Sequence, residues 1–307
     1  MKTRNESTKR ALLVIMFFIV FGGILHAQTK TIKILAIGNS FSEDAIENYL
    51  YELGAAENIN FIIGNAYIGG CSLERHYNNS QSNEAAYAFR KIVKGVKTTH
   101  PERTLESCIT DESWDYISVQ QVSGNSGIYY TYFPYLTELL AYVKGKATNK
   151  NVKYMLHRTW AYAQTSTHGD FVKYDKNQEM MYSAIVDATN KVKADVIDIS
   201  FIIPAGTAIQ NGRSSSIGDI FCRDGYHLDL NIGRYTAACT WFEKITGIIV
   251  VGNAAIPANI SAFEAKVAQN AAHFAVLKPN EVTSMKEFKG EEMKDVAFQM
   301  SIAAQNY

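Results

Sequence analysis

Two short segments of the chain carry residues that could act together as a nucleophile and its base. Residues 38–42, Gly-Asn-Ser-Phe-Ser, offer two hydroxyls, and Asp224 and His227 lie three residues apart. A serine hydroxyl is a poor nucleophile until a base takes its proton, and an imidazole that a carboxylate holds in one tautomer is the usual base. The pattern therefore predicts nucleophilic catalysis by Ser40 with His227 and Asp224. The plainer alternatives are a serine that only caps a helix and an Asp-x-x-His spacing that arises by chance in a surface turn.

Two further segments could stabilise the negative charge that such an attack creates. Gly69 and Gly70 lie in Asn-Ala-Tyr-Ile-Gly-Gly, where a backbone N–H can approach a ligand closely. Gln120, Gln121 and Asn125 follow the next apolar run, and their side-chain amides can donate hydrogen bonds. Each segment also has a simple structural explanation, because paired glycines form turns and amides serve loops. Spacing alone does not choose between these explanations.

These segments are placed by an alternation of strand and helix patterns along the chain. Apolar runs rich in β-branched residues predict strands, and apolar side chains at helical spacing predict helices. Such alternation favours a parallel sheet with helices on both faces, whose reactive groups gather at the carboxyl ends of the strands. We therefore predict a three-layer α/β/α protein with a mostly parallel, five-stranded sheet of the flavodoxin-like kind. Strands are expected at residues 31–37, 59–63, 116–119, 152–156 and 196–199, and helices at residues 104–112, 132–143, 177–192, 232–245 and 263–277.

Two stretches need a separate interpretation. Ser42, followed by Glu43 and Asp44, is the better predicted cap of the first helix, because a hydroxyl and acids are typical of a helix start. Residues 77–103 fit the alternation poorly and predict a hairpin inserted over the sheet edge.

The first 27 residues have the pattern of a secretory signal peptide. Residues 1–10 hold four bases and one acid, residues 11–25 carry no charge, and the small residue Ala27 follows. The alternative is a membrane anchor, but 15 residues fall short of the roughly 20 that span a bilayer as a helix. No cysteine ends the apolar run, so we do not expect a lipoprotein. The protein is therefore expected to be secreted or periplasmic, with no stable membrane anchor after cleavage.

Composition excludes several other classes of protein. The 307 residues include 47% hydrophobic residues and only 5 prolines, which excludes a disordered or collagen-like chain. The whole chain has 30 bases and 30 acids, and removal of residues 1–27 leaves 26 bases against 29 acids. A mildly acidic protein has no electrostatic reason to bind nucleic acid. Isolated histidines and the lack of a Cys-x-x-Cys spacing predict no metal site and no cofactor.

The order of the motifs resembles that of the SGNH hydrolases, the GDSL esterase/lipase superfamily. Gly-Asn-Ser, Asn-Ala-x-Ile-x-Gly and Asp-Gly-x-His occur in the expected order. The resemblance implies that Ser40 is the nucleophile, with Asn39 in place of the usual Asp. It also implies that the N–H groups of Ser40 and Gly70 form part of the oxyanion hole and that Asp224 and His227 complete the triad.

The third motif of this superfamily departs from the expected Gly-x-Asn-Asp. Gln121 resembles the glutamine that follows the third strand in sialate-O-acetylesterase-like members, whereas Asn125 would preserve the residue type. We favour Gln121 as the third oxyanion donor, with Asn125 as the alternative. The resemblance extends from residue 33 to about residue 247, which implies a hydrolase-like domain over residues 28–280 and leaves 281–307 as a C-terminal tail.

The resemblance implies a secreted serine esterase that removes short acyl groups, above all O-acetyl, from a carbohydrate. The alternative is a glycan-binding protein of the same fold that is inactive or weakly active, since the third motif is altered and fold does not guarantee chemistry. Trp160 and Tyr162, after the fourth strand, either face a sugar or belong to the core. The fold would bring Cys71 and Cys222 to one rim, where they either form a disulfide bridge or remain buried thiols.

Overall fold

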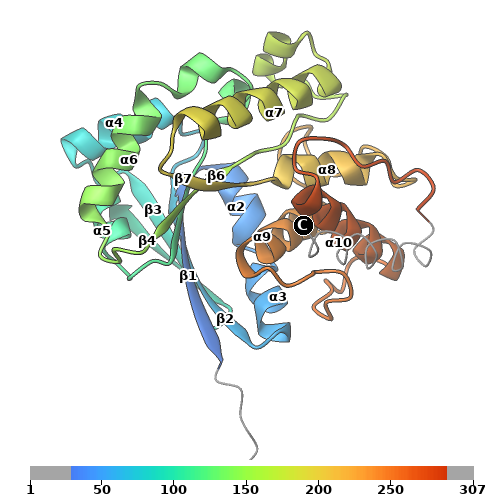
Figure 1. Ribbon diagram of the computed structural model, residues 1–307, viewed down its shortest axis with the longest axis horizontal. Coiled ribbons are helices and arrows are strands. Elements are labelled where there is room, and N and C mark those ends of the chain that lie inside the picture. Colours follow the sequence, from blue (N-terminus) through green and yellow to red (C-terminus); the bar gives the residue numbers. More distant parts are fainter. Residues whose placement is uncertain (1–28, 289–307) are drawn as a thin grey trace, which may run out of the picture. The chain divides into compact units, whose positions relative to one another are not determined.

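The central sheet has seven strands within residues 29–288, the part of the chain that this computed structural model describes (Figure 1). The strand order is β4-β3-β2-β1-β5-β6-β7. β5 pairs with both β1 and β6 in parallel, and β6 pairs with β7 in parallel, whereas β2, β3 and β4 form antiparallel pairs. The strands are β1 (Lys30–Gly38), β2 (Ile59–Tyr67), β3 (Tyr87–Val93), β4 (Val96–Arg103), β5 (Tyr116–Val119), β6 (Lys153–His157) and β7 (Ile199–Ile203).

The predicted α/β fold with a mostly parallel sheet is confirmed, but the prediction of five strands is wrong. The two additional strands, β3 and β4, form the hairpin expected within residues 77–103, and they extend the sheet beyond β2 instead of lying over its edge. β4 is exposed over almost its whole length, so its stability comes from pairing with β3. Because it buries no apolar face, its sequence lacks the apolar pattern that predicts a strand. Residues 77–82 belong to a helix instead.

The fifth predicted strand lies later in the chain than residues 196–199. β7 begins only at Ile199, because Val196 closes the preceding helix and Ile197 is 91% exposed. The sequence there holds two apolar runs in succession, and only the second pairs with β6.

Helices cover both faces of the sheet (Figure 1). Alternate residues of β1 point to opposite faces, and both sets are buried: Ile34 belongs to one apolar core and Leu35 to the other. α2, α3, α8, α9 and α10 contribute to the first core, and α4, α5 and α6 to the second. The helices are α2 (Ser40–Ile46), α3 (Leu50–Ala56), α4 (Leu73–Ser82), α5 (Leu105–Ile109), α6 (Tyr135–Lys146), α7 (Gln178–Asp195), α8 (Ala205–Arg213), α9 (Ile232–Thr246) and α10 (Ala262–Leu277), with short 3-10 turns η1 (Ser123–Asn125), η2 (Tyr129–Tyr132) and η3 (Gly169–Tyr174).

The expected segments at the two ends of the chain fall mainly outside the described residues. The predicted signal peptide, residues 1–27, lies wholly outside them, and so does the predicted tail from residue 289 onward. Among the described residues, no helix combines the length and the apolar character needed to cross a membrane.

Candidate active site

Ser40 is the first residue of α2 and directly follows the central strand β1. The prediction that Ser42 caps this helix is wrong: the cap is Asn39, whose side-chain oxygen accepts the N–H of Phe41 at 3.0 Å. The Ser42 hydroxyl is buried and bonds instead to the carbonyl of Asn39 and the side chain of Asn65. The first N–H groups of a helix have no intrahelical acceptor, so the hydroxyl of Ser40 lies beside a free backbone donor.

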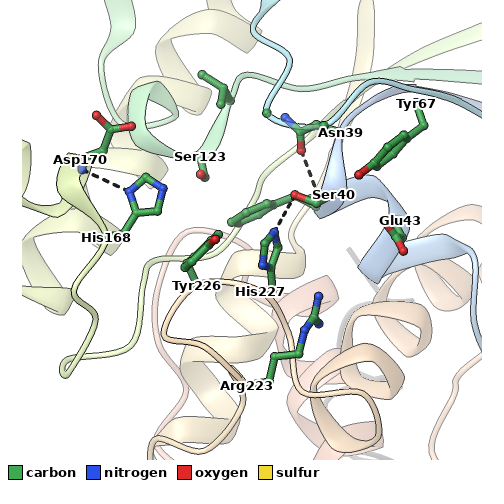
Figure 2. Close-up of a pocket in the computed structure, with 14 residues that line it drawn as sticks. Asn39, Ser40, Glu43, Tyr67, Ser123, His168, Asp170, Arg223, Tyr226 and His227 are labelled. Carbon is green, nitrogen blue, oxygen red and sulfur yellow. Dashed lines mark hydrogen bonds between the residues drawn. The ribbon is translucent and has the colours of Figure 1, made fainter. Parts of the chain in front are cut away.

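Ser40, His227 and Asp224 form a continuous hydrogen-bonded chain. His227 Nε2 lies 2.8 Å from Ser40 Oγ (Figure 2). On the other side of the ring, His227 Nδ1 lies 2.6 Å from Asp224 Oδ2. An ionised carboxylate can only accept, so Nδ1 carries the proton and Nε2 of the neutral ring is free to accept from Ser40. The side chain of His227 is 18% exposed and that of Asp224 is 40% exposed.

The turn between Asp224 and His227 fixes the orientation of the imidazole. Gly225 has φ +90°, a conformation that side-chain-bearing residues rarely adopt. This turn lets Asp224 Oδ1 accept the N–H groups of Tyr226 and His227 at 3.1 and 2.8 Å. Partial burial alone would raise the pKa of Asp224, but the hydrogen bonds from the His227 ring and from these N–H groups outweigh it and hold the pKa below the ordinary value of 3.8.

A buried carboxylate joins this loop to the helix that carries Ser40. Asp44, one turn into α2 and fully buried, accepts the N–H of Leu228 at 2.8 Å. It also forms ion pairs with Arg223 at 3.1 Å and with Arg234 at 2.7 Å. Ser40 and His227 are therefore held together through contacts other than their own hydrogen bond.

Asn39 connects Ser40 to the glycine loop after β2. Its Nδ2 donates to the carbonyl of Cys71 at 3.0 Å, and its Oδ1 also accepts from Gln120 Nε2 at 2.8 Å. An aspartate could not make the first of these bonds, since a carboxylate has no proton to donate. Gln120 is in turn bonded to the buried His157 at 2.9 Å. Asn39 thus holds Gly70, the residue before Cys71, close to the start of α2.

Gly70 offers a second free backbone donor in the same cavity. Its φ is +61°, and a Cβ built on it would meet nothing within 4 Å, so the glycine faces open space. Among the described residues, neither its N–H nor that of Ser40 has a hydrogen-bond acceptor. Both residues line a cavity of about 520 Å³ together with Asn39 and His227.

The structure does not bring Gln121 or Asn125 to this cavity. Gln121 is buried, and its Nε2 donates to the carbonyl and the hydroxyl of Thr131, while its Oε1 accepts the N–H of Leu73. Asn125 accepts from Lys173. Neither residue is among those that line the cavity of Ser40. The amide of Gln121 joins the loop after β5 to Leu73 and Thr131. Because both N–H groups are used in this way, none is left to donate to an oxyanion.

Several residues that line the cavity were not singled out from the sequence (Figure 2). Ser123 lies on one side of Ser40 with His168 and Asp170, and Tyr67 and Glu43 lie on the other. Tyr226 lies between His168 and His227, with ring centroids 4.7 and 4.1 Å away in an edge-to-face and a tilted arrangement. These residues come from several separate segments of the chain, and none belongs to a recognisable motif except Tyr226, the variable position of Asp-Gly-x-His.

Trp160 and Tyr162 belong to the core, since both side chains are fully buried. Trp160 stacks on Phe41 at 4.4 Å, and its Nε1 donates to the carbonyl of Tyr226 at 2.7 Å, so it supports the loop that carries Asp224 and His227. All four cysteines lie within the described residues and are free thiols, so Cys71 and Cys222 form no disulfide bridge here.

Comparison with known proteins gives one strong match and several weak ones. The family described as "Domain of unknown function (DUF4886)" matches residues 33–275. A crystal structure of a DUF4886 family protein from Bacteroides uniformis ATCC 8492 is 54% identical, covers 85% of this chain and 100% of its own, and has a TM-score of 0.83. No curated protein matches the chain.

Weaker structural similarity extends to proteins described as esterases. One is a carbohydrate esterase family 3 protein from Talaromyces cellulolyticus, 10% identical, covering 70% of this chain and 97% of its own with a TM-score of 0.42. Another is a catalytic mutant of Axe2, an acetylxylan esterase from Geobacillus stearothermophilus, 8% identical, covering 76% and 100% with a TM-score of 0.42. Similarity this distant does not define an activity. The match over residues 33–275 does define the family, and the chain belongs to the DUF4886 family.

Proposed function

We propose that this protein is a serine ester hydrolase of the SGNH type. The observation that carries the proposal is the hydrogen-bonded chain from Ser40 Oγ through His227 to Asp224, with distances of 2.8 and 2.6 Å. The free N–H groups of Ser40 and Gly70 beside that hydroxyl support the same conclusion, because acyl transfer needs donors where the oxyanion develops.

The proposed reaction proceeds through an acyl enzyme. Ser40 Oγ attacks the ester carbonyl while His227 Nε2 takes its proton, and Asp224 stabilises the imidazolium. The N–H groups of Ser40 and Gly70 donate to the oxyanion. Collapse of this intermediate breaks the bond to the alcohol, which leaves with the proton from His227. Water, activated by the same imidazole, then releases the acid and restores Ser40.

We further propose a carbohydrate ester, above all an acetate, as the substrate. The cavity combines aromatic surfaces, Tyr67 and Tyr226, with carboxylates, Glu43 and Asp170. Aromatic faces suit sugar rings, and carboxylates accept hydrogen bonds from sugar hydroxyls. Export from the cytoplasm, which the pattern of residues 1–27 predicts, would bring the protein to such polymers.

The direct test is hydrolysis of 4-nitrophenyl acetate and covalent labelling by a fluorophosphonate probe. The purified protein should do both, and Ser40→Ala should lose at least about 10³-fold in kcat together with all labelling. Ser42→Ala is the matched control, because it lies on the same helix but its hydroxyl is bonded within the protein. Activity that survives in Ser40→Ala contradicts the role of Ser40.

The glycan-binding alternative predicts a different result in the same test. A protein that only binds should leave the probe unreacted, while a soluble acetylated polysaccharide still binds to it. If labelling occurs, a screen for acetate release over acetylated polysaccharides would identify the sugar.

A further inference from the structure

The cavity is lined by a serine, Ser123, whose hydroxyl the proposed mechanism has not yet used. Ser123 begins η1, the turn after β5, and the residue is only 6% exposed. It lines the cavity together with Ser40 and Gly70. In Figure 2 its hydroxyl points from the loop into the space between His168 and Ser40. It therefore comes from the same loop as Gln121 and Asn125 but, unlike them, reaches the cavity.

The hydrogen bonding of Ser123 determines where its proton points. Its Oγ lies 2.8 Å from the hydroxyl of Tyr162, and either atom could be the donor on distance alone. Tyr162 is fully buried, and within the described residues its hydroxyl has no other partner. A buried O–H without an acceptor costs about 1 to 3 kcal/mol, so the phenol donates to Ser123.

The state of Tyr162 is consistent with this direction. Burial raises the pKa of Tyr162 above its ordinary value, which keeps the phenol protonated and able to donate. Ser123 Oγ then accepts from Tyr162, and its own proton is left without an acceptor among residues 29–288. A hydroxyl that accepts one hydrogen bond also becomes a stronger donor of the next.

We propose that Ser123 supplies the third hydrogen bond of the oxyanion hole, in the place predicted for Gln121. This inference rests on the proposed esterase function. When Ser40 Oγ bonds to the carbonyl carbon, the carbonyl π electrons move to oxygen and the serine proton moves to His227. The oxyanion then accepts from the N–H groups of Ser40 and Gly70 and from Ser123 Oγ–H. When the alcohol leaves, the carbonyl re-forms and Ser123 keeps its proton throughout.

Substitution of Ser123 should affect the transition state more than substrate binding. Ser123→Ala should lower kcat by about 10²- to 10³-fold, the usual cost of one oxyanion donor, with KM changed less than about threefold. Ser123→Thr keeps the hydroxyl and should recover most of the rate. The rate of fluorophosphonate labelling at Ser40 should fall in parallel in Ser123→Ala, because the phosphonyl oxygen needs the same donors.

A matched variant separates catalysis from loop structure. Ser126 is buried in the same loop and bonds to the carbonyl of Ser123, but it does not line the cavity. Ser126→Ala should therefore leave kcat within about threefold of wild type, and an equal loss in both variants would assign a structural role and overturn the inference. If Ser123→Ala fails to fold, Ser123→Cys keeps the side-chain size with a weaker donor and should still lose rate.

The possible outcomes also separate this inference from the proposed function. Full activity in Ser123→Ala, with an inactive Ser40→Ala, overturns the role of Ser123 and leaves the esterase intact. A wild-type protein that neither hydrolyses esters nor reacts with the probe overturns both.

Discussion

Asn39 is the residue that joins the three loops around Ser40. It caps α2, donates to the carbonyl of Cys71 and accepts from Gln120. Asn39→Asp keeps the size and the cap but turns the bond to Cys71 into a repulsion between oxygens. We expect kcat to fall about tenfold, or about 1.4 kcal/mol, because Gly70 loses its support. Steady-state kinetics with an unchanged kcat would show that the Gly70 loop is held without Asn39.

The pair of Asp224 and His227 predicts the shape of the pH profile. Because the pKa of Asp224 is below 3.8, its carboxylate stays ionised throughout the range in which histidines titrate. Protonation of Asp224 should therefore contribute nothing to the pH dependence of kcat/KM above about pH 5. A loss of kcat/KM above that pH that disappears in Asp224→Asn would mean that the carboxylate takes up a proton more easily than its hydrogen bonds imply. Asp224→Asn should lower kcat by about 10²- to 10⁴-fold.

At the scale of elements, the contact between α2 and the loop that carries Asp224 and His227 depends on Asp44. This buried carboxylate forms ion pairs with Arg223 and Arg234 and accepts a hydrogen bond from the N–H of Leu228. Removing one partner from a buried ion pair costs about 3 to 5 kcal/mol, so Asp44→Ala should lower the free energy of unfolding by that amount in urea titrations. Glu43→Gln is the control, because Glu43 directly precedes Asp44 on the helix and its side chain is partly exposed. This substitution should lower the free energy of unfolding by less than about 1 kcal/mol. Equal losses in the two variants would mean that the buried ion pairs of Asp44 stabilise the protein no more than the partly exposed ion pair of Glu43.

Local patterns predicted the elements that carry the site better than the contacts that complete it. β1 and α9 are continuous apolar or periodic segments, and their predicted positions nearly match the structure. α8 was missed because it is buried on all sides and mixes small and polar residues, which leaves no period. The bonds of Asn39 to Gln120 and of Asp44 to Arg223 join residues far apart in the sequence, and no local spacing encodes them.

The sequence does not reveal that Gln121, the predicted third oxyanion donor, lies outside the cavity of Ser40, for a related reason. Gln121 and Ser123 both follow β5, and only the turn η1 decides which side chain faces the cavity. The resemblance favoured a residue type, whereas the structure directs a shorter side chain into the cavity. Ser40, Asp224 and His227 were easier to place, because two of them lie on one turn and the third follows the central strand.

At the scale of the whole molecule, the buried histidines His76 and His157 connect stability to pH. Burial lowers the pKa of His76 and of His157 to about 3. In the unfolded chain each imidazole takes up a proton as the pH falls through its ordinary value of 6.5, whereas in the folded protein it stays neutral until about pH 3. The unfolded state therefore binds more protons in this window, and stability falls as the pH falls from about 6.5 towards 3.

His76 offers the cleaner test, because it contacts Tyr87, a residue of the second apolar core, and does not line the cavity of Ser40. Each such histidine makes the free energy of unfolding fall by up to about 1.4 kcal/mol per pH unit between about pH 6 and 4. His76→Gln removes one of these two histidines. The free energy of unfolding of this variant, measured by urea titration, should therefore depend on pH less steeply than that of wild type by about this amount. Above about pH 7.5 the imidazole is neutral in both states, so the difference between the two proteins should become constant and report only the lost packing. Parallel curves from pH 4 to 8 would mean that His76 takes up its proton equally well in the folded protein.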